Sequence, residues 1–214
     1  MNLRVVLAIA LMAVPAASVA QVADEGTLII RSAGRDIGVE TFRVTTGAAG
    51  LRITARSSFA GTRPPTELSA SLDRAAEGTE LAFQLERRGG GGAGQIYAVQ
   101  KRNRLTIRRV ERGSEQASEV PGGEGLVLLA DSIFALYLQF VPLATESGRV
   151  LSAIVPQGVR RLQVTAQRQR SSQAGGTLLR LSGGVEGEVA LGNRGEVLRI
   201  SLPALGLEAV RKRD

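Results

Sequence analysis

The chain has 214 residues and a formal net charge of +7, and it contains neither histidine nor cysteine. The two absences exclude Ser-His-Asp and Cys-His catalysis and the usual zinc, copper and non-haem iron sites. We therefore predict a protein that is not an enzyme, with no catalytic residues, no metal site and no cofactor.

The first 20 residues predict a signal peptide. Arg4 precedes an apolar core over Val5–Val14, Pro15 ends that core, and the small residues Ser18–Ala20 offer a cleavage site. The core is shorter than the roughly 20 residues that cross a bilayer. A buried first helix is the alternative, and the polar residues that follow disfavour it. We expect a periplasmic or secreted protein with one β-rich domain over residues 21–214.

Alternating apolar and polar residues predict consecutive antiparallel strands over residues 26–112. Leu51, Ile53 and Ala55, for example, alternate with polar residues, which is typical of a strand with one buried face. Turn residues separate the strands from one another. The stretch 114–125 is polar and then rich in proline and glycine, so we predict that it is a connection.

The longest apolar run outside the first 20 residues predicts a helix near residues 131–142. Its apolar arc spans about 200°, well beyond the ~100° stripe that one packed face needs. Asp131 stands at its start and is predicted to cap the helix through a side-chain oxygen. A transmembrane helix is the alternative. Asp131 and Gln139 within the run, and the lack of flanking lysine or arginine clusters, disfavour it.

One face of a sheet covers only part of such a helix. We therefore predict that the rest of its apolar surface contacts an apolar ligand or a partner. A helix that belongs entirely to the core is the alternative. The predicted contact residues are Phe134, Tyr137, Leu138 and Val141.

Further strand patterns follow the helix, within residues 150–155, 162–169, 177–181, 185–191, 196–202 and 206–211. The whole chain is then predicted to hold about a dozen strands, and a sheet of that length curls or closes rather than staying flat. We expect a mainly β fold: a large curled antiparallel sheet or half-barrel, with one apolar helix packed on or across it.

Arginine-rich clusters, such as Arg87-Arg88, Arg108-Arg109 and Arg160-Arg161, indicate attraction to an anionic membrane surface. A solvated sheet face is the alternative explanation. Nucleic acid is not an expected partner, because the chain lacks the interleaved aromatic residues on which bases stack. The glycine-rich run 89–94 has the spacing of a nucleotide-binding loop, but a strand pattern follows it, so it predicts a hairpin tip.

Three stretches of the sequence carry a resemblance to known families. The first consists of Gly34, Ile37, Gly38, Glu40, Phe42, Arg43 and Val44. The second is DSIFALYLQFV, which begins at Asp131, and the third is NRGEVLRISLPALGLEAVR near the end of the chain. In this layout the chain resembles periplasmic domains of unknown function whose open or half-closed β-barrels are similar to bacterial lipoprotein carriers. The resemblance implies a concave sheet that holds an acyl chain or apolar peptide under a helical lid, and it implies no catalytic residue.

Two hypotheses follow, and they differ in whether the core leaves room for a ligand. The first is a non-enzymatic exported β-domain that binds or carries a lipid, an acyl chain or an apolar peptide in the cell envelope. The second is a structural or assembly protein of the envelope, with a filled core and partners bound at an exposed sheet edge.

Overall fold

The computed structural model describes residues 20–60, 65–90, 92–171 and 176–213. The predicted signal peptide therefore lies outside the described residues, except for Ala20. Fifteen strands form one sheet in the described part of the chain. The strands of its first half are β1 (Gln21–Ser32), β2 (Arg35–Gly47), β3 (Gly50–Phe59), β4 (Thr66–Ala75), β5 (Glu80–Arg88), β6 (Gly94–Lys101), β7 (Arg104–Glu111) and β8 (Ser114–Pro121). The strands of its second half are β9 (Val127–Leu128), β10 (Arg149–Val155), β11 (Arg160–Arg170), β12 (Thr177–Gly183), β13 (Gly187–Leu191), β14 (Val197–Leu202) and β15 (Leu207–Arg211).

The strands run in the order β8 to β1 and then β15 to β9 across the sheet. All neighbours are antiparallel except β9 and β10. The chain thus forms two meanders that join where β1 pairs with β15, with Leu28 opposite Arg211 and Ile30 opposite Ala209.

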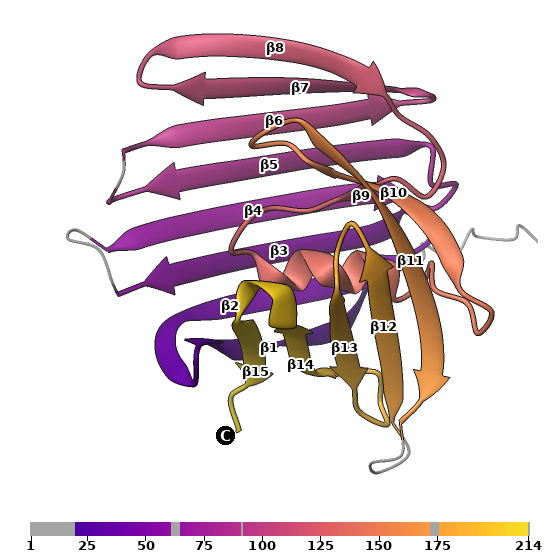
Figure 1. Cartoon of the computed structure of the whole chain (residues 1–214). Coiled ribbons are helices and arrows are strands. Elements are labelled where there is room, and N and C mark those ends of the chain that lie inside the picture. Colours follow the sequence, from indigo (N-terminus) through magenta and orange to yellow (C-terminus); the bar gives the residue numbers. More distant parts are fainter. Residues whose placement is uncertain (1–19, 61–64, 91, 172–175, 214) are drawn as a thin grey trace, which may run out of the picture.

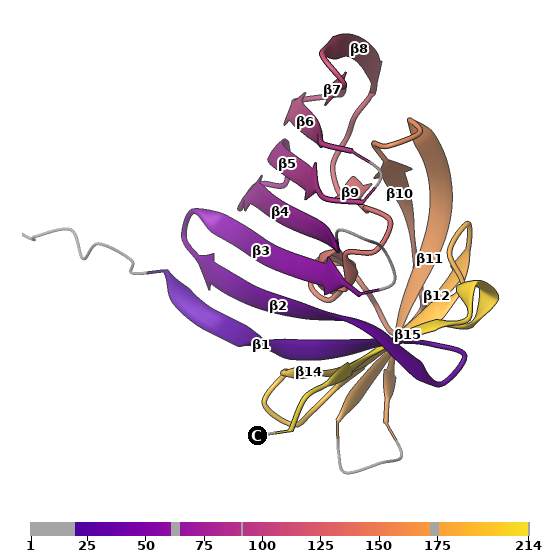
Figure 2. The same ribbon diagram turned by 90° about the vertical axis from the view of Figure 1, so that its left-hand side faces the viewer.

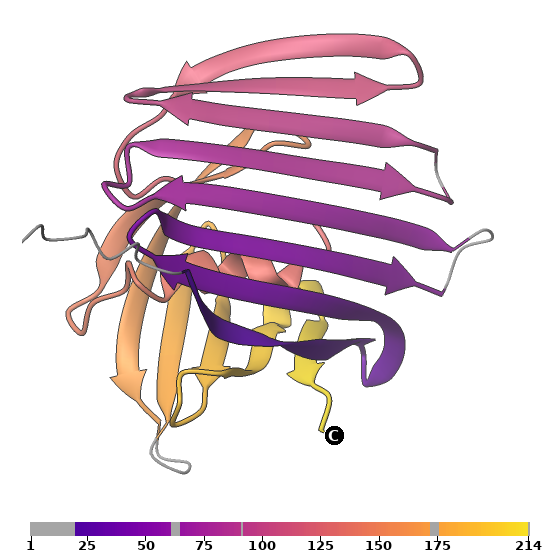
Figure 3. The same ribbon diagram turned by 180° about the vertical axis from the view of Figure 1, so that it is seen from behind.

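The sheet curls into an open trough (Figure 1, Figure 2), and β8 and β9 are its two edge strands. From behind, the long strands of the first meander form one broad wall (Figure 3). The second meander forms the opposite wall. The prediction of a mainly β fold with a large curled sheet is confirmed.

The sheet has more strands than the dozen predicted, partly because the stretch 114–125 is more than a connection. Residues Ser114–Pro121 form β8, which pairs with β7. Most side chains of β8 are exposed, so the apolar alternation that marks a half-buried strand is absent there. Polar residues suit an edge strand because they discourage pairing with another chain.

The inner face of the trough carries the hydrophobic core. In β3, Ile53 and Ala55 point inward and are buried, as their alternation predicts. Inward positions of neighbouring strands lie opposite one another and so form rows across the sheet. One such row consists of Phe42, Ala55, Ala70, Leu85 and Ile96.

The predicted helix is a short 3-10 helix, η1 (Phe134–Phe140), in contact with β3 and β9. It lies between the two walls, in the base of the trough (Figure 2). The prediction of a helix over residues 131–142 is too long at its start, because Ser132 has a φ of 69° and Ile133 is extended. All seven residues of η1 are buried.

A second 3-10 turn, η2 (Pro203–Leu205), precedes β15. Among the described residues, no helix has both the length and the apolar character needed to cross a membrane.

Candidate functional site

A buried carboxylate from β2 holds the N-terminal end of η1. Glu40 is 0% exposed, and its Oε2 accepts hydrogen bonds from the Phe134 backbone N–H (2.9 Å) and the Ser57 hydroxyl (2.7 Å). Its Oε1 accepts the backbone N–H of Ala135 at 2.7 Å. These bonds satisfy amides that the start of a helix leaves without partners. Burial raises the pKa of Glu40 above its ordinary value, and the three hydrogen bonds act in the opposite direction.

The prediction that Asp131 caps the helix is wrong. The Asp131 side chain is 68% exposed and lies beside Arg160, with 3.4 Å between Oδ1 and Nη2. Ile133, directly before η1, has no side-chain cap hydrogen bond. Because the irregular backbone at residues 132–133 separates Asp131 from the first helical amide, Glu40, which is 94 positions away from Phe134, takes the predicted role.

Gln139, also 0% exposed, fastens the other end of η1. Its Oε1 accepts hydrogen bonds from the Leu128 N–H (3.2 Å) and Arg74 Nη2 (2.9 Å). Its Nε2 donates to the carbonyls of Leu128 (2.6 Å) and Leu136 (2.9 Å). Burial lowers the pKa of Arg74 to about 10, and Arg74 forms no ion pair with a described residue. These bonds tie η1 to β4 and β9, so the helix is a fixed base of the trough.

The four predicted contact residues lie in or beside this base. Phe134 is 2% exposed, Leu138 7% and Tyr137 8%, and Val141 is half-buried. Burial and, secondly, the charge of Asp131 raise the pKa of Tyr137 to about 12. Contact between these four side chains and a ligand stays a prediction. Tyr137 also lines a cavity of about 170 Å³, whose apolar walls include Leu129, Val155, Leu162, Val185 and Leu202.

A larger opening lies between the inner face of β4–β7 and the turn that joins β10 to β11. It consists of two hollows, of about 390 and 480 Å³, which share Arg87, Glu111 and Gln157. We name the two together the cleft. Asp131 also lines it, from the side of the second meander. The apolar floor of the cleft consists of Phe59, Leu68, Leu85 and Ile96.

The floor ends at two arginines that occupy inward positions of the sheet. Leu85 lies opposite Ile96, and Ile96 lies opposite Arg109 on the next strand. In the adjacent row, Leu68 lies opposite Arg87. The cleft therefore places cationic side chains directly beside an apolar floor.

Two arginines, Arg109 and Arg161, also bridge the gap between the two walls. Arg109 Nη1 donates to the backbone carbonyl of Gln157 at 2.9 Å, and its Nη2 donates to Gln116 Oε1 at 2.8 Å. A further bond runs from Arg161 of β11 to the carbonyl of Pro121 at the end of β8. Side chains, and not strand pairing, thus connect the walls at the open side of the trough.

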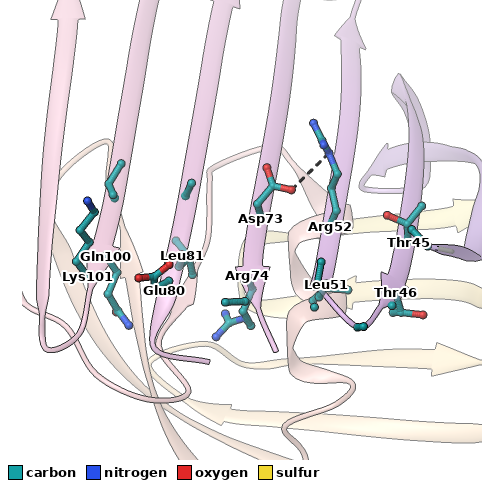
Figure 4. A pocket seen from close by; sticks show the side chains of 18 residues that line it. Thr45, Thr46, Leu51, Arg52, Asp73, Arg74, Glu80, Leu81, Gln100 and Lys101 are labelled. Carbon is teal, nitrogen blue, oxygen red and sulfur yellow. Dashed lines mark ion pairs between the residues drawn. The ribbon is translucent and has the colours of Figure 1, made fainter. Parts of the chain in front are cut away.

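A further hollow, of about 480 Å³, lies at the opposite ends of strands β4–β6 (Figure 4). Arg52 and Asp73 form an ion pair of 3.5 Å in it, and Glu80 lies opposite Lys101 in the sheet register. Its lining comes from Ala20 and β2–β6 with their turns, so only the first meander contributes. The cleft, in contrast, is lined by both meanders, and we take the cleft as the candidate site.

No family model and no curated protein matches the sequence. Among solved structures, the chain is similar to a β-barrel-like protein of a domain of unknown function, DUF1849, from Brucella abortus. The TM-score is 0.55, and the match covers 88% of this chain and 94% of the other at 8% sequence identity. The chain has a barrel-like fold. This finding confirms the predicted resemblance to barrel-like domains of unknown function, and at this identity it concerns the fold alone.

Glu40, Arg87 and Arg109 were not predicted from the sequence as site residues. Each occupies an inward position in a strand whose other inward residues are mostly apolar. In the barrel-like sheet, adjacent arginines also point to opposite faces: Arg88 is on the outer face and pairs with Glu86 at 2.7 Å, whereas Arg87 points inward. A charged residue in phase with the buried positions was the available signal. Attraction of the outer arginines to an anionic membrane stays a prediction.

Proposed function

We propose that the protein is a non-enzymatic binding protein of the cell envelope, which holds or carries an apolar ligand such as a lipid or acyl chain in the cleft. The main support for this proposal is an apolar floor that lines an open space. Leu68, Leu85 and Ile96 are inward-facing core residues, and they border a hollow of about 390 Å³. Ligand pockets in proteins typically measure roughly 300–1,000 Å³.

The fixed base of the trough supports this proposal. Buried hydrogen bonds hold η1 at both ends, through Glu40 and Gln139. A rigid support keeps a binding site pre-formed and reduces the entropy that binding costs. We therefore assign η1 the role of a support for the cleft, in place of the lid that the family resemblance implies. The envelope location rests on the predicted signal peptide.

A substitution at Gly94 tests the proposal. Gly94 lines the cleft between Arg87 and Glu111 in the sheet register, and a Cβ atom there would meet Glu111 Cγ at 3.4 Å, an ordinary contact. Gly94→Leu therefore fills the cleft without straining β6. We expect the wild type to bind the neutral fluorescent probe N-phenyl-1-naphthylamine, and Gly94→Leu to weaken its affinity at least about tenfold, as a loss of about 1.4 kcal/mol does.

Ala117→Leu is the matched control, because Ala117 is exposed on β8 and the change likewise adds an apolar side chain. It should leave probe affinity unchanged. Urea unfolding of both variants checks that the fold is retained. Absence of probe binding to the wild type, or equal binding by Gly94→Leu and the wild type, contradicts the proposal.

The second candidate function is a structural or assembly protein of the envelope. The complete burial of η1 and the exposed edge strand β8 favour it. Mass spectrometry of an organic extract of the purified protein separates the two candidates. A co-purified lipid supports the binding protein, and an extract without lipid from a protein that also binds no probe supports the structural role.

A further inference from the structure

We propose that the cleft is specific for an amphiphile with an acidic head group, a carboxylate or a phosphate, and that Arg87 and Arg109 bind this head. The inference rests on the proposed function and adds the chemical class of the ligand. It follows from the hydrogen bonding, the charge and the position of the two arginines.

Both arginines have a buried N–H group without an acceptor. The Nε atoms of Arg87 and Arg109 are buried and have no hydrogen-bond partner among the described residues. Native proteins leave few buried donors in this state, so each one calls for an explanation. The Arg87 side chain is also 39% exposed, so an acid group in the cleft can reach the outer N–H groups of its guanidinium, whose planar donors match the oxygen atoms of an acid.

The charge of the cleft also favours an anion. Three arginines, Arg87, Arg109 and Arg112, line the cleft together with two acids, Glu111 and Asp131, and Asp131 already lies 3.4 Å from Arg160. Arg87 Nη2 lies 3.5 Å from Glu111 Oε1, whereas Arg109 and Arg112 form no ion pair in the described part of the chain. A positive excess in a sheltered hollow attracts and retains an anionic ligand.

The position of the arginines favours an amphiphile over a free anion. Arg109 continues the row of Leu85 and Ile96, and Arg87 lies opposite Leu68, with about 4.8 Å between neighbouring strands. An acyl chain on the floor therefore brings its head to both guanidinium groups. A free anion would leave the apolar floor unused.

Arg74 shows that a buried guanidinium alone is not sufficient for this assignment. Its Nε and Nη1 also lack partners, but its Nη2 donates to the Leu126 carbonyl and to Gln139 in the base of the trough. The hollow beside it holds Arg52 and Lys101 together with two acids, Asp73 and Glu80. In that hollow the charges other than Arg74 are matched, with Arg52 paired to Asp73 and Lys101 opposite Glu80, whereas in the cleft Arg109 and Arg112 have no ion pair with a described residue.

Displacement of N-phenyl-1-naphthylamine from the full chain tests the inference. The competitors are dodecanoate, dodecyl phosphate, 1-dodecanol and inorganic phosphate. We expect the wild type to bind both acidic amphiphiles at least about tenfold more tightly than the alcohol, since hydrogen bonds to charged groups are strong. Inorganic phosphate should displace no probe and should leave dodecanoate affinity unchanged.

Two double variants of equal charge identify the residues responsible. Arg87→Gln with Arg109→Gln should reduce the preference for acid over alcohol to less than about twofold. Arg88→Gln with Arg108→Gln removes the same charge from the outer face, where the arginines pair with Glu86 and Glu115, and should keep the preference. If the first double variant fails to fold, Arg87→Gln alone should reduce the preference, because Arg87 makes no bond across the open side of the trough.

The outcomes separate this inference from the proposed function. Equal affinity for the acids and the alcohol in the wild type overturns the inference and leaves the binding function intact. An equal loss of preference in both double variants also overturns it, since the effect is then one of net charge. If neither the probe nor any amphiphile binds, the proposed function and the inference fail together.

Discussion

The base of the trough and the cleft lie on the same inner sheet face, but they differ in how their polar groups are bonded. In the base, Glu40 and Gln139 use every side-chain oxygen and nitrogen in hydrogen bonds, although Arg74, which donates to Gln139, keeps Nε and Nη1 without partners among the described residues. In the cleft, the Nε atoms of Arg87 and Arg109 are buried without acceptors. The base, which is closed around η1, stabilises the fold, whereas the cleft leaves the Arg87 side chain 39% exposed beside an open apolar floor, where a ligand can reach it.

Truncation of one apolar residue in each region gives the largest expected effect. Phe134→Ala in the base should lower the free energy of unfolding by about 3–5 kcal/mol and leave the affinity for the neutral probe unchanged. Leu85→Ala in the cleft should cost only about 2 kcal/mol, because the residue borders an existing hollow, and should weaken probe binding. Urea unfolding and probe titration measure both quantities. The sequence-based prediction, in contrast, has Phe134 contact an apolar ligand, so it expects Phe134→Ala to weaken probe binding. A loss of probe binding in this variant would support that prediction.

A smaller effect is expected from the polar bonds of the base. Gln139→Leu leaves the Leu128 N–H without its acceptor and removes one acceptor of Arg74, which should cost about 1–3 kcal/mol. Adding Arg74→Met removes the buried cation as well. The double variant should then be more stable than Gln139→Leu alone. Replacing both hydrogen-bond partners by apolar side chains costs less unfolding free energy than leaving one of them buried and unpaired. Thermal unfolding of the two single variants and the double variant measures this coupling, and additive losses would argue against it.

The smallest expected effect is a pH dependence from Glu40. Its folded-state pKa is raised by burial, so the folded protein binds the proton more tightly than the unfolded chain does. The resulting stabilisation is present below the unfolded pKa and is lost as the pH rises through the folded pKa. The wild type should therefore lose unfolding free energy over that window relative to Glu40→Gln, which does not titrate there. Urea unfolding of both proteins from pH 4 to pH 8 measures the difference, and parallel curves would show that Glu40 contributes none of it.

Local patterns in the sequence predicted most of the fold because the inner and outer faces of the sheet differ in polarity. Ile53 and Ala55, for instance, mark β3 by alternation alone. The same rule does not detect β8, whose side chains face solvent on most sides. The helix was predicted from its apolar run, but its 3-10 form and its late start depend on the backbone at residues 132–133.

The candidate site was harder to predict because its residues meet through long-range pairing. Adjacency in the sequence grouped Arg87 with Arg88, whereas the pleat of a strand sends them to opposite faces. The acid at the start of η1 comes from β2, and no local spacing connects Glu40 to Phe134. A charge in phase with buried positions marks such residues, but their partners become visible only in three dimensions.

The pairing of β1 with β15 has a consequence for the order of folding. Every other antiparallel pair in the sheet joins strands that are consecutive in sequence, whereas this one brings Leu28 to Arg211. Hairpins of either meander close short loops and form quickly, but the central pair closes a loop that spans nearly the whole chain. During synthesis from the N-terminus, β1 is the first strand to emerge, and one of its edges stays unpaired until residues 207–211 arrive. Over that interval the nascent chain exposes a strand edge to other chains, so its greatest risk of aggregation precedes the arrival of its last strand.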